Sequence, residues 1–341
     1  MTHPFSESDI KTFISLVQSA ERIVIVSHKS PDGDSVGSSM AMYHWLMQWQ
    51  ANKTIHVCHP DVAPEFIQWA DEHHVIRNFQ DHQTEVETTL NEADLVLCLD
   101  FNDFSRVGQD MEPVLTNCPA KKVMIDHHMH PNLDQFTLSF SFPDHCSTCE
   151  LLMELILASG HENLISPELG ASLYLGLVTD TGSFRFNSVR KETHQLVAIL
   201  LNAGVNHTAV HERTFDDNTL ERIRLRSYIL SECLEVWAKE QAAILYLKEA
   251  DIQRLTMQKG DTEGLVNVAL SIKGVSRAAF FKEEDGYVRI SFRSKEGKTV
   301  NAIAQKYFHG GGHQQASGGR FDGTLEDAIA KFKEVLQYED N

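Results

Sequence analysis

The stretch IVIVSHKSPDGDSVGSS, residues 23–39, runs from an apolar segment through a polar loop into small residues that open a helical pattern. Its first four residues, 23–26, are apolar and β-branched, which predicts a short buried strand. His28, Asp32 and Asp34 follow this strand, at the position where open α/β sheets place their ligand sites. One interpretation is a metal site. The other is a plain Pro-Asp-Gly turn and a helix whose N-cap is Asp34.

Two further apolar segments also end on acidic or imidazole side chains. Residues 93–99 (ADLVLCL) lead into Asp100, and residues 121–125 (KKVMI) lead into the tripeptide DHH at 126–128. Residues 54–59 (TIHVCH) predict another strand. Because helical patterns separate these strands, we predict an α/β fold with a parallel sheet and helices on both faces. The carboxyl ends of parallel strands share one edge, so the polar side chains are expected to converge there.

The pattern along the chain predicts two domains. We expect an α/β domain over residues 1–204, a charged amphipathic helical linker over 205–240 and a smaller α/β domain over 241–341. The smaller domain contains GGGHQQASGG, residues 310–319, which we expect to form a loop. Glycines let backbone N–H groups approach a phosphate closely and form an anion-binding concavity. A flexible connection is the alternative interpretation.

Composition limits the partners and the compartment. The chain has 341 residues and a formal net charge of −18, and its first 239 residues hold 16 Lys and Arg against 33 Asp and Glu. This acidity argues against binding long duplexes by phosphate neutralisation, but small anionic substrates stay open if metal ions supply positive charge. We expect no membrane span and no signal peptide, because neither apolar pattern is found. Six scattered cysteines favour the reducing cytoplasm.

The polar side chains at the predicted sheet edge suit divalent cations. The candidates are His28, Asp32, Asp34, Asp100, Asp126, His127, His128 and Asp180. Carboxylates with one or two imidazoles favour hard to borderline ions such as Mn²⁺ or Mg²⁺. There are enough ligands for two ions that share a bridging carboxylate, as in two-metal hydrolases. The predicted reaction class is metal-assisted hydrolysis of a phosphoester or phosphoanhydride.

These motifs resemble those of the DHH phosphoesterase family. HKSPDGD at 28–34, Asp100 after a strand, DHH at 126–128 and VTDTG around Asp180 resemble the four family motifs in their order. Residues 310–319 resemble the glycine-rich signature of the DHH-associated domain. The resemblance covers essentially the whole chain and implies a DHH domain joined by the linker to a DHH-associated domain. Within the family, the layout is most similar to bifunctional oligoribonucleases that also act on 3′-phosphoadenosine 5′-phosphate (pAp).

The resemblance implies how two cations divide the ligands. Mn²⁺ is the expected ion, with Mg²⁺ or Co²⁺ as alternatives. The first ion would be held by His28, Asp32 and Asp100. The second would be held by Asp34, Asp100, His127 and Asp180, with Asp100 bridging. His128 would donate a hydrogen bond to the scissile phosphate, and Asp126 would orient its neighbours.

A second set of residues is expected to bind the substrate. It comprises Arg106, Arg293, Ser294, Gly310, Gly311, Gly312, His313 and Ser317. A guanidinium pairs bidentately with phosphate, which suits Arg106, although a surface arginine is the alternative interpretation. Arg293 and Ser294 end a predicted strand within reach of the glycine-rich stretch. His309 and Ser317 stand where members of the family commonly carry glycine and alanine.

The implied substrates are short single-stranded oligoribonucleotides, hydrolysed to mononucleotides, or small phosphorylated nucleotides such as pAp. The resemblance leaves several other functions open. One is a cyclic-dinucleotide phosphodiesterase, and another is an exopolyphosphatase or pyrophosphatase, although those enzymes are expected to carry a different second domain. A nucleotide-binding regulator without activity is the alternative outside the enzymes. A homodimer is compatible with the sequence.

Overall fold

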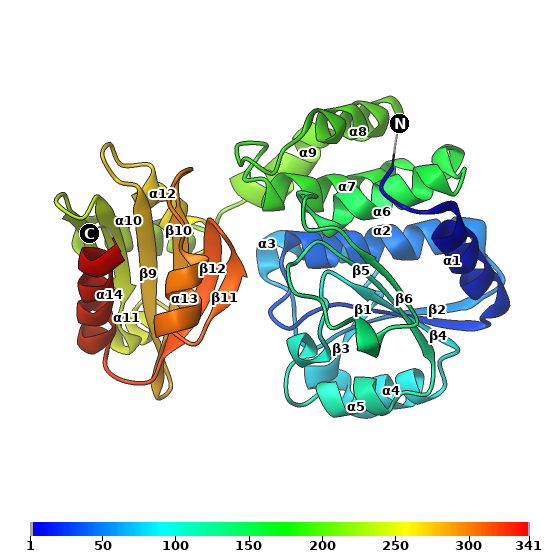
Figure 1. Cartoon of the computed structure of the whole chain (residues 1–341), viewed down its shortest axis with the longest axis horizontal. Coiled ribbons are helices and arrows are strands. Elements are labelled where there is room, and N and C mark those ends of the chain that lie inside the picture. The colour runs from blue at the N-terminus through cyan, green and yellow to red at the C-terminus, as the bar shows by residue number, and fades with distance from the viewer. Residues whose placement is uncertain (1–2, 340–341) are drawn as a thin grey trace. The chain divides into compact units, whose positions relative to one another are not determined.

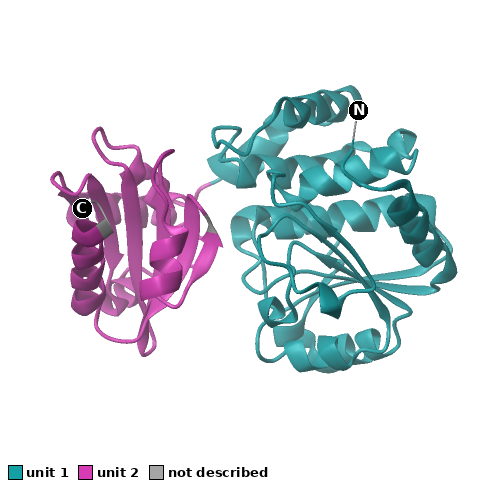
Figure 2. Ribbon diagram, in the orientation of Figure 1, with its two compact units in different colours: residues 1–217 teal, residues 218–341 magenta. Residues whose placement is uncertain are grey.

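The computed structural model describes residues 3–339, apart from the side chains of His313 and Glu339. The chain divides into two compact units, Met1–Asp217 and Asn218–Asn341 (Figure 2). Each unit is built around its own sheet, so each has a core of its own. Among the described residues, no helix is long and apolar enough to cross a membrane.

Unit 1 is built on a six-stranded sheet in the order β3-β2-β1-β4-β5-β6, and all neighbouring strands are parallel. The strands are β1 (Arg22–Val26), β2 (Thr54–His59), β3 (Ile76–Asn78), β4 (Leu95–Leu99), β5 (Lys121–Asp126) and β6 (Leu138–Ser141). The predicted α/β class with a parallel sheet is confirmed. β3 and β6 were not predicted, because these edge strands are only 3 and 4 residues long and mostly half-buried.

Helices cover both faces of this sheet (Figure 1). The helices of unit 1 are α1 (Glu7–Ser19), α2 (Gly33–Trp49), α3 (Glu65–Gln68), α4 (Phe79–Asn91), α5 (Glu112–Asn117), α6 (Thr148–Ala158), α7 (Pro167–Asp180), α8 (Lys191–Asn202) and α9 (His207–His211). In β1, Ile23 and Ile25 pack in the core that α1, α2, α6 and α7 share, whereas Val24 and Val26 pack in the core under α4 and α5. Both faces of β1 are therefore buried in apolar cores, which explains its continuous apolar sequence.

The strand order reverses between β1 and β4. The chain passes from β1 to β2 on one side, and β4 lies on the other side of β1. In doubly wound sheets this switch point opens a crevice at the carboxyl ends of the two strands, where ligands bind. His28 follows β1 and Asp100 follows β4, so the topology places these two side chains at the crevice.

Helices α2 and α7 approach each other closely through glycines. A Cβ atom on Gly33 would lie 2.3 Å from Oγ1 of Thr179, and one on Gly37 would lie 2.5 Å from the carbonyl oxygen of Ser172. A Cβ on Gly176 would lie 2.5 Å from Oδ1 of Asp34. At Gly37 two backbones come together, whereas at Gly33 and Gly176 a Cβ would overlap neighbouring side chains, so all three positions favour glycine.

We expect Gly37→Ala to lower the free energy of unfolding of unit 1 by about 1–3 kcal/mol, because the added methyl overpacks a buried helix contact. The obstructing atom is a backbone carbonyl oxygen, that of Ser172, which a side-chain rotation cannot remove. Urea unfolding followed by tryptophan fluorescence measures the change, since three of the four tryptophans lie in unit 1. Ser38→Ala, on the same helix, adds no volume and serves as the control. Equal unfolding midpoints for both variants would contradict the prediction.

Unit 2 contains a mixed six-stranded sheet in the order β11-β12-β10-β9-β8-β7, in which only β8 and β9 pair in parallel. The strands are β7 (Leu234–Trp237), β8 (Ala242–Leu247), β9 (Arg277–Glu284), β10 (Tyr287–Ser294), β11 (Gly311–His313) and β12 (Ala316–Phe321). The helices are α10 (Leu220–Glu232), α11 (Glu249–Arg254), α12 (Leu265–Leu270), α13 (Asn301–Tyr307) and α14 (Leu325–Glu339). The smaller α/β unit that the sequence predicted is present.

The glycine-rich stretch at 310–319 is a β-hairpin, so the predicted loop is wrong. Gly311 pairs with Gly318 across the hairpin. A Cβ on Gly310 would lie 2.0 Å from the carbonyl oxygen of Gly318, and one on Gly312 would lie 2.7 Å from that of Ala316. The glycines thus allow the two strands of the hairpin to pack closely. A stretch this rich in glycine is also typical of loops, so the hairpin was not predicted.

Candidate two-metal site

Three groups of side chains in unit 1 are spaced to hold a cation, with the ligand atoms of each group within 4.8 Å of one another. The groups are His28, Asp32 and Asp100; Asp34, His127 and Asp180; and Asp100, His127 and His128. The loops after β1, β4 and β5, the first turn of α2 and the end of α7 supply them. The structure therefore brings together seven of the eight cation candidates named from the sequence, and Asp126 lies beside them.

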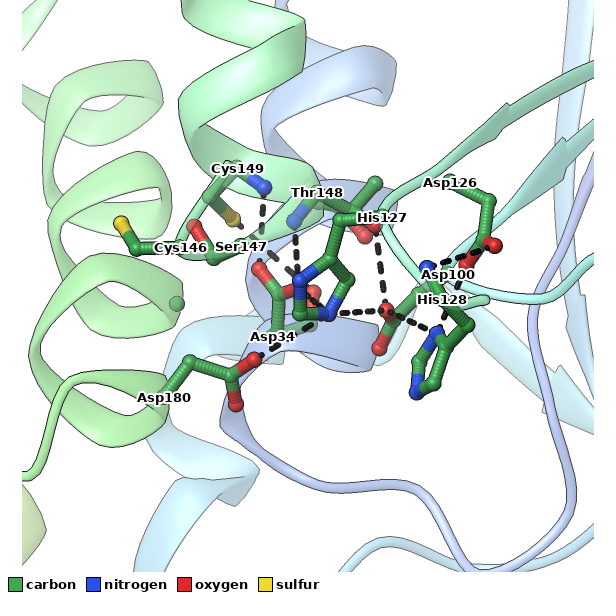
Figure 3. A network of polar contacts seen from close by, with 12 residues as sticks. Asp34, Asp100, Asp126, His127, His128, Cys146, Ser147, Thr148, Cys149 and Asp180 are labelled. Carbon is green, nitrogen blue, oxygen red and sulfur yellow. Dashed lines mark hydrogen bonds and ion pairs between the residues drawn. The ribbon is translucent and has the colours of Figure 1, made fainter. Parts of the chain in front are cut away.

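Asp100 belongs to two of the three groups, and its carboxylate lies between the rings of His127 and His128 (Figure 3). Its Oδ2 is 3.2 Å from Nε2 of His28, and its Oδ1 is 3.6 Å from Nε2 of His127. The residue has a left-handed backbone, with φ of 65°, which aspartate adopts more readily than most side chains. One carboxylate thus presents an oxygen to each of two imidazoles, which is the geometry of a bridging ligand.

Backbone carbonyls fix the orientation of two imidazoles. Nδ1 of His28 donates to the carbonyl oxygen of Lys29 at 2.9 Å, and Nδ1 of His127 donates to that of His145 at 3.2 Å. A carbonyl only accepts, so Nδ1 carries the proton in both rings. In the neutral rings the lone pair is then on Nε2, the atom that faces the carboxylates. Both histidines are held in the tautomer that a metal ligand needs.

The imidazole of His128 is hydrogen-bonded to Asp126 rather than to a backbone carbonyl. Oδ1 of Asp126 accepts from the Nδ1 of His128 at 2.8 Å, and its Oδ2 accepts from the backbone N–H of His128 at 2.8 Å. Burial lowers the pKa of His128, but the hydrogen bond and charge of Asp126 outweigh it and raise the pKa above its ordinary value. The amide of Asn102 donates to the carbonyl of His128 at 3.0 Å and fixes this loop further. The orienting role assigned to Asp126 and the phosphate-binding role of His128 stay predictions.

The carboxylates of Asp32 and Asp34, at the start of α2, accept hydrogen bonds from different helices. Oδ1 of Asp32 accepts from the backbone N–H groups of Asp34 at 3.1 Å and Ser35 at 3.0 Å, so Asp32 is the N-cap. The alternative in which Asp34 caps this helix is wrong. The carboxylate of Asp34 instead accepts from the backbone N–H groups of Thr148 at 2.6 Å and Cys149 at 2.9 Å, at the start of α6.

The cluster concentrates acidic groups out of water. Asp34, Asp100 and Asp126 are each at most 1% exposed. Burial and the neighbouring Asp32 raise the pKa of Asp34 to about 6, and burial and Asp34 hold the pKa of Asp100 well above its usual range. Such crowding of buried carboxylates is costly unless positive charge is bound among them. With imidazoles as the other donors, the residues fit divalent cations of the Mn²⁺ or Mg²⁺ type.

Several residues that contact the cluster escaped the sequence analysis. They are Asn102, His145, Thr148 and the backbone of Cys149. The sequence STCE at 147–150 is a capping-box pattern that predicts a helix start, and this was the available signal. All six cysteines are buried, and none forms a disulfide.

Arg106 lies close to the cluster. It is exposed in the 3₁₀ turn Phe104–Val107, and its carbonyl oxygen accepts from the backbone N–H of Lys29 at 2.8 Å. The charge of Arg106 lowers the pKa of His128, which places the guanidinium within electrostatic reach of that imidazole. Its role as a phosphate clamp stays a prediction.

The other predicted substrate residues lie in unit 2. Arg293 and Ser294 end β10, and the neighbouring Phe292 pairs with Ser317 of β12. The hydroxyl of Ser294 donates to the carbonyl of Lys298 at 2.8 Å, and a guanidinium nitrogen of Arg293 donates to the carbonyl of Phe292 at 3.0 Å. Gly310, Gly311 and Gly312 lie in or beside the hairpin, and the side chain of His313 is outside the described part of the chain. Substrate binding by this set stays a prediction.

Comparison with known proteins finds relatives over the whole chain. The family model for the DHH family, N-terminal domain, matches residues 22–177, and the model for the DHHA1 domain matches residues 240–338. The bifunctional oligoribonuclease and PAP phosphatase NrnA of Bacillus subtilis is 27% identical over 301 residues, covering 87% of this chain and 88% of that protein. NrnA of Mycoplasma genitalium is 28% identical over 318 residues, covering 92% of each. The crystal structure of an exopolyphosphatase-related protein from Bacteroides fragilis has a TM-score of 0.93 and 35% identity, covering 99% of this chain and 98% of that one.

Proposed function

Because the chain belongs to the DHH family and carries its DHHA1 domain, we propose that it is a metal-dependent phosphoesterase acting on short oligoribonucleotides and on pAp. It would cleave the former to mononucleotides and remove the 3′-phosphate of the latter. The observation that carries the proposal is the placement of Asp100 between two groups of cation ligands. The names of the NrnA relatives support the choice of substrates.

The residues divide the work as follows. His28, Asp32 and Asp100 would hold one divalent cation, and Asp34, Asp100, His127 and Asp180 the other. Bound there, the cations would supply positive charge to the phosphate and lower the pKa of water. We propose Mn²⁺ as the ion, with Mg²⁺ or Co²⁺ as alternatives.

The protein groups around the phosphate complete the mechanism. His128, hydrogen-bonded to Asp126, donates a hydrogen bond to a phosphoryl oxygen, and its raised pKa favours the form with both ring nitrogens protonated. Arg106 binds a second phosphate oxygen. In unit 2, backbone N–H groups of the glycine-rich hairpin bind the terminal phosphate of the nucleotide. We assign the protein to the cytoplasm as part of the same proposal, since six free thiols suit a reducing compartment.

A substrate comparison tests the proposal. The purified full chain with Mn²⁺ is offered the dinucleotide pApA, pAp, pyrophosphate and a cyclic dinucleotide in parallel. We expect turnover of pApA and pAp. Rapid hydrolysis of pyrophosphate without nucleotide turnover would overturn the proposal in favour of a pyrophosphatase, and exclusive cleavage of the cyclic substrate would favour a cyclic-dinucleotide phosphodiesterase.

Mn²⁺ is expected to stabilise unit 1 more strongly as the pH rises from 5 to 7. The raised pKa of Asp34, about 6, means that the ion-free folded state keeps a proton that the unfolded state has lost above its ordinary value of 3.8. Ion-free stability therefore falls as the pH rises from 3.8 to about 6, and a cation that replaces the proton gains affinity until Asp34 is fully ionised. At 100 times its Kd, Mn²⁺ contributes about 2.7 kcal/mol, which raises Tm by roughly 5–10 °C. Thermal unfolding with Mn²⁺ or EDTA at each pH measures this, and a shift that does not change with pH would contradict it.

A further inference from the structure

Thr148, the first residue of α6, contacts candidate ligands from two of the groups, Asp34 and Asp100. Its backbone N–H donates to Oδ2 of Asp34 at 2.6 Å, and its hydroxyl donates to Oδ1 of Asp100 at 3.0 Å (Figure 3). All three residues are buried. The hydroxyl is on a β-branched side chain with few rotamers, so the direction of its hydrogen bond is fixed by the helix.

The start of α6 makes a second bond to Asp34 and also contacts a third candidate ligand, His127. Next to Thr148, the N–H of Cys149 donates to the other carboxylate oxygen of Asp34 at 2.9 Å. The carbonyl of His145, three residues before Thr148, accepts from Nδ1 of His127 at 3.2 Å. One short turn thus orients a ligand from each of three different loops.

The buried carboxylate of Glu150 stabilises the start of α6. Glu150 is fully buried, its Oε2 accepts from the backbone N–H of Cys146 at 2.8 Å, and its own N–H donates to the hydroxyl of Ser147 at 3.0 Å. Its Oε1 accepts from the hydroxyl of Thr193 at 2.5 Å and lies 3.2 Å from the guanidinium of Arg190. These partners belong to α8 and to its N-cap, so α8 fixes the geometry of the turn.

We propose that Thr148 is a positioning residue that holds Asp34 and Asp100 in the arrangement that binds the two cations, an inference that rests on the proposed function. The hydrogen bond from its hydroxyl restrains rotation of the Asp100 carboxylate, and its backbone N–H restrains the carboxylate of Asp34. Partners of this kind behind metal ligands typically contribute 10- to 100-fold in metal affinity.

The test compares two substitutions that differ in the hydroxyl. Thr148→Val keeps the shape of the side chain and removes the donor, whereas Thr148→Ser keeps the donor and removes a methyl. Isothermal titration of each full-length variant with Mn²⁺ alone measures affinity without any turnover. We expect Thr148→Val to weaken Mn²⁺ binding by about 10- to 100-fold and Thr148→Ser to bind within about threefold of the unchanged protein.

A matched control separates positioning from general stability. Thr214 is also buried in unit 1, and its hydroxyl accepts from Nε1 of Trp69 at 3.2 Å, so Thr214→Val removes one buried hydrogen bond elsewhere. We expect this variant to lose stability but to bind Mn²⁺ normally. If Thr148→Val does not fold by circular dichroism, Thr148→Ala against Thr148→Ser makes the same comparison.

The outcomes separate the inference from its premise. Unchanged Mn²⁺ affinity in Thr148→Val would overturn the inference, and so would equal losses in the valine and serine variants. If the unchanged protein binds no Mn²⁺, the result contradicts the proposed metal dependence itself, and the inference falls with it. Loss in the valine variant with rescue by serine supports the positioning role.

Discussion

Asp100→Asn is expected to lower the rate of phosphoester hydrolysis by about 10³-fold, because charge stabilisation by bound metal is worth several kcal/mol. Asp100 faces His28 with one carboxylate oxygen and His127 with the other, so its change affects both ion sites together. Asparagine keeps the size of the side chain and tolerates the left-handed backbone at this position, where φ is 65°. The loss can therefore be attributed to the missing charge rather than to misfolding.

Initial rates on pApA with saturating Mn²⁺ measure the effect of Asp100→Asn. The matched control is Asp94→Asn, which makes the same chemical change just before β4, at the opposite end of the strand from Asp100. Asp94 is exposed and accepts hydrogen bonds from the backbone of residues 21 and 22, so it contacts none of the cation ligands that the structure describes. We expect this control to keep its activity within about twofold. More than a tenth of the original rate in Asp100→Asn would rule out a bridging role.

The sequence predicts the sheet edge well because the signal there is local. Each strand that carries the site is a short apolar run that ends on a charged side chain, and buried parallel strands require such runs. β2 has the predicted bounds, and β1 and β5 each differ from the prediction by one residue. Once the sheet is known to be parallel, the convergence of His28, Asp100 and the residues after β5 follows from topology alone.

The support for these ligands could not be predicted, because it is neither local nor carried by characteristic side chains. The N–H groups of α6 that hold Asp34 belong to residues 114 and 115 positions further along the chain. The carbonyl that orients His127 belongs to the backbone of His145, and any residue supplies a carbonyl. The hairpin of unit 2 was missed for a related reason: its glycines permit close strand packing, and glycines at that density also mark loops.

His128→Gln is expected to lower kcat on pApA by about 10²-fold, the usual contribution of a positioned acid, while leaving Mn²⁺ affinity within about threefold. The structure offers His128 two roles, since it lies in a group with Asp100 and His127 that could hold a cation. Its Nδ1 is 2.8 Å from Oδ1 of Asp126 but 3.7 Å from Oδ1 of Asp100, so this nitrogen is engaged by a carboxylate outside the groups. The other ring nitrogen points away from Asp126 (Figure 3).

Measuring kcat and Mn²⁺ affinity on the same variant therefore distinguishes the two roles of His128. A donor to the phosphate changes the chemical step and not the cation equilibrium, so the loss should be confined to kcat. A tenfold or greater loss of Mn²⁺ affinity would instead make His128 a ligand. One of the two cations would then be assigned to Asp100, His127 and His128. His130→Gln, two residues further along the same loop and exposed, is the control for disturbance of the loop itself. If Asp126 acts through His128, as proposed, Asp126→Asn reproduces the kcat loss in part and adds little to it when the two changes are combined.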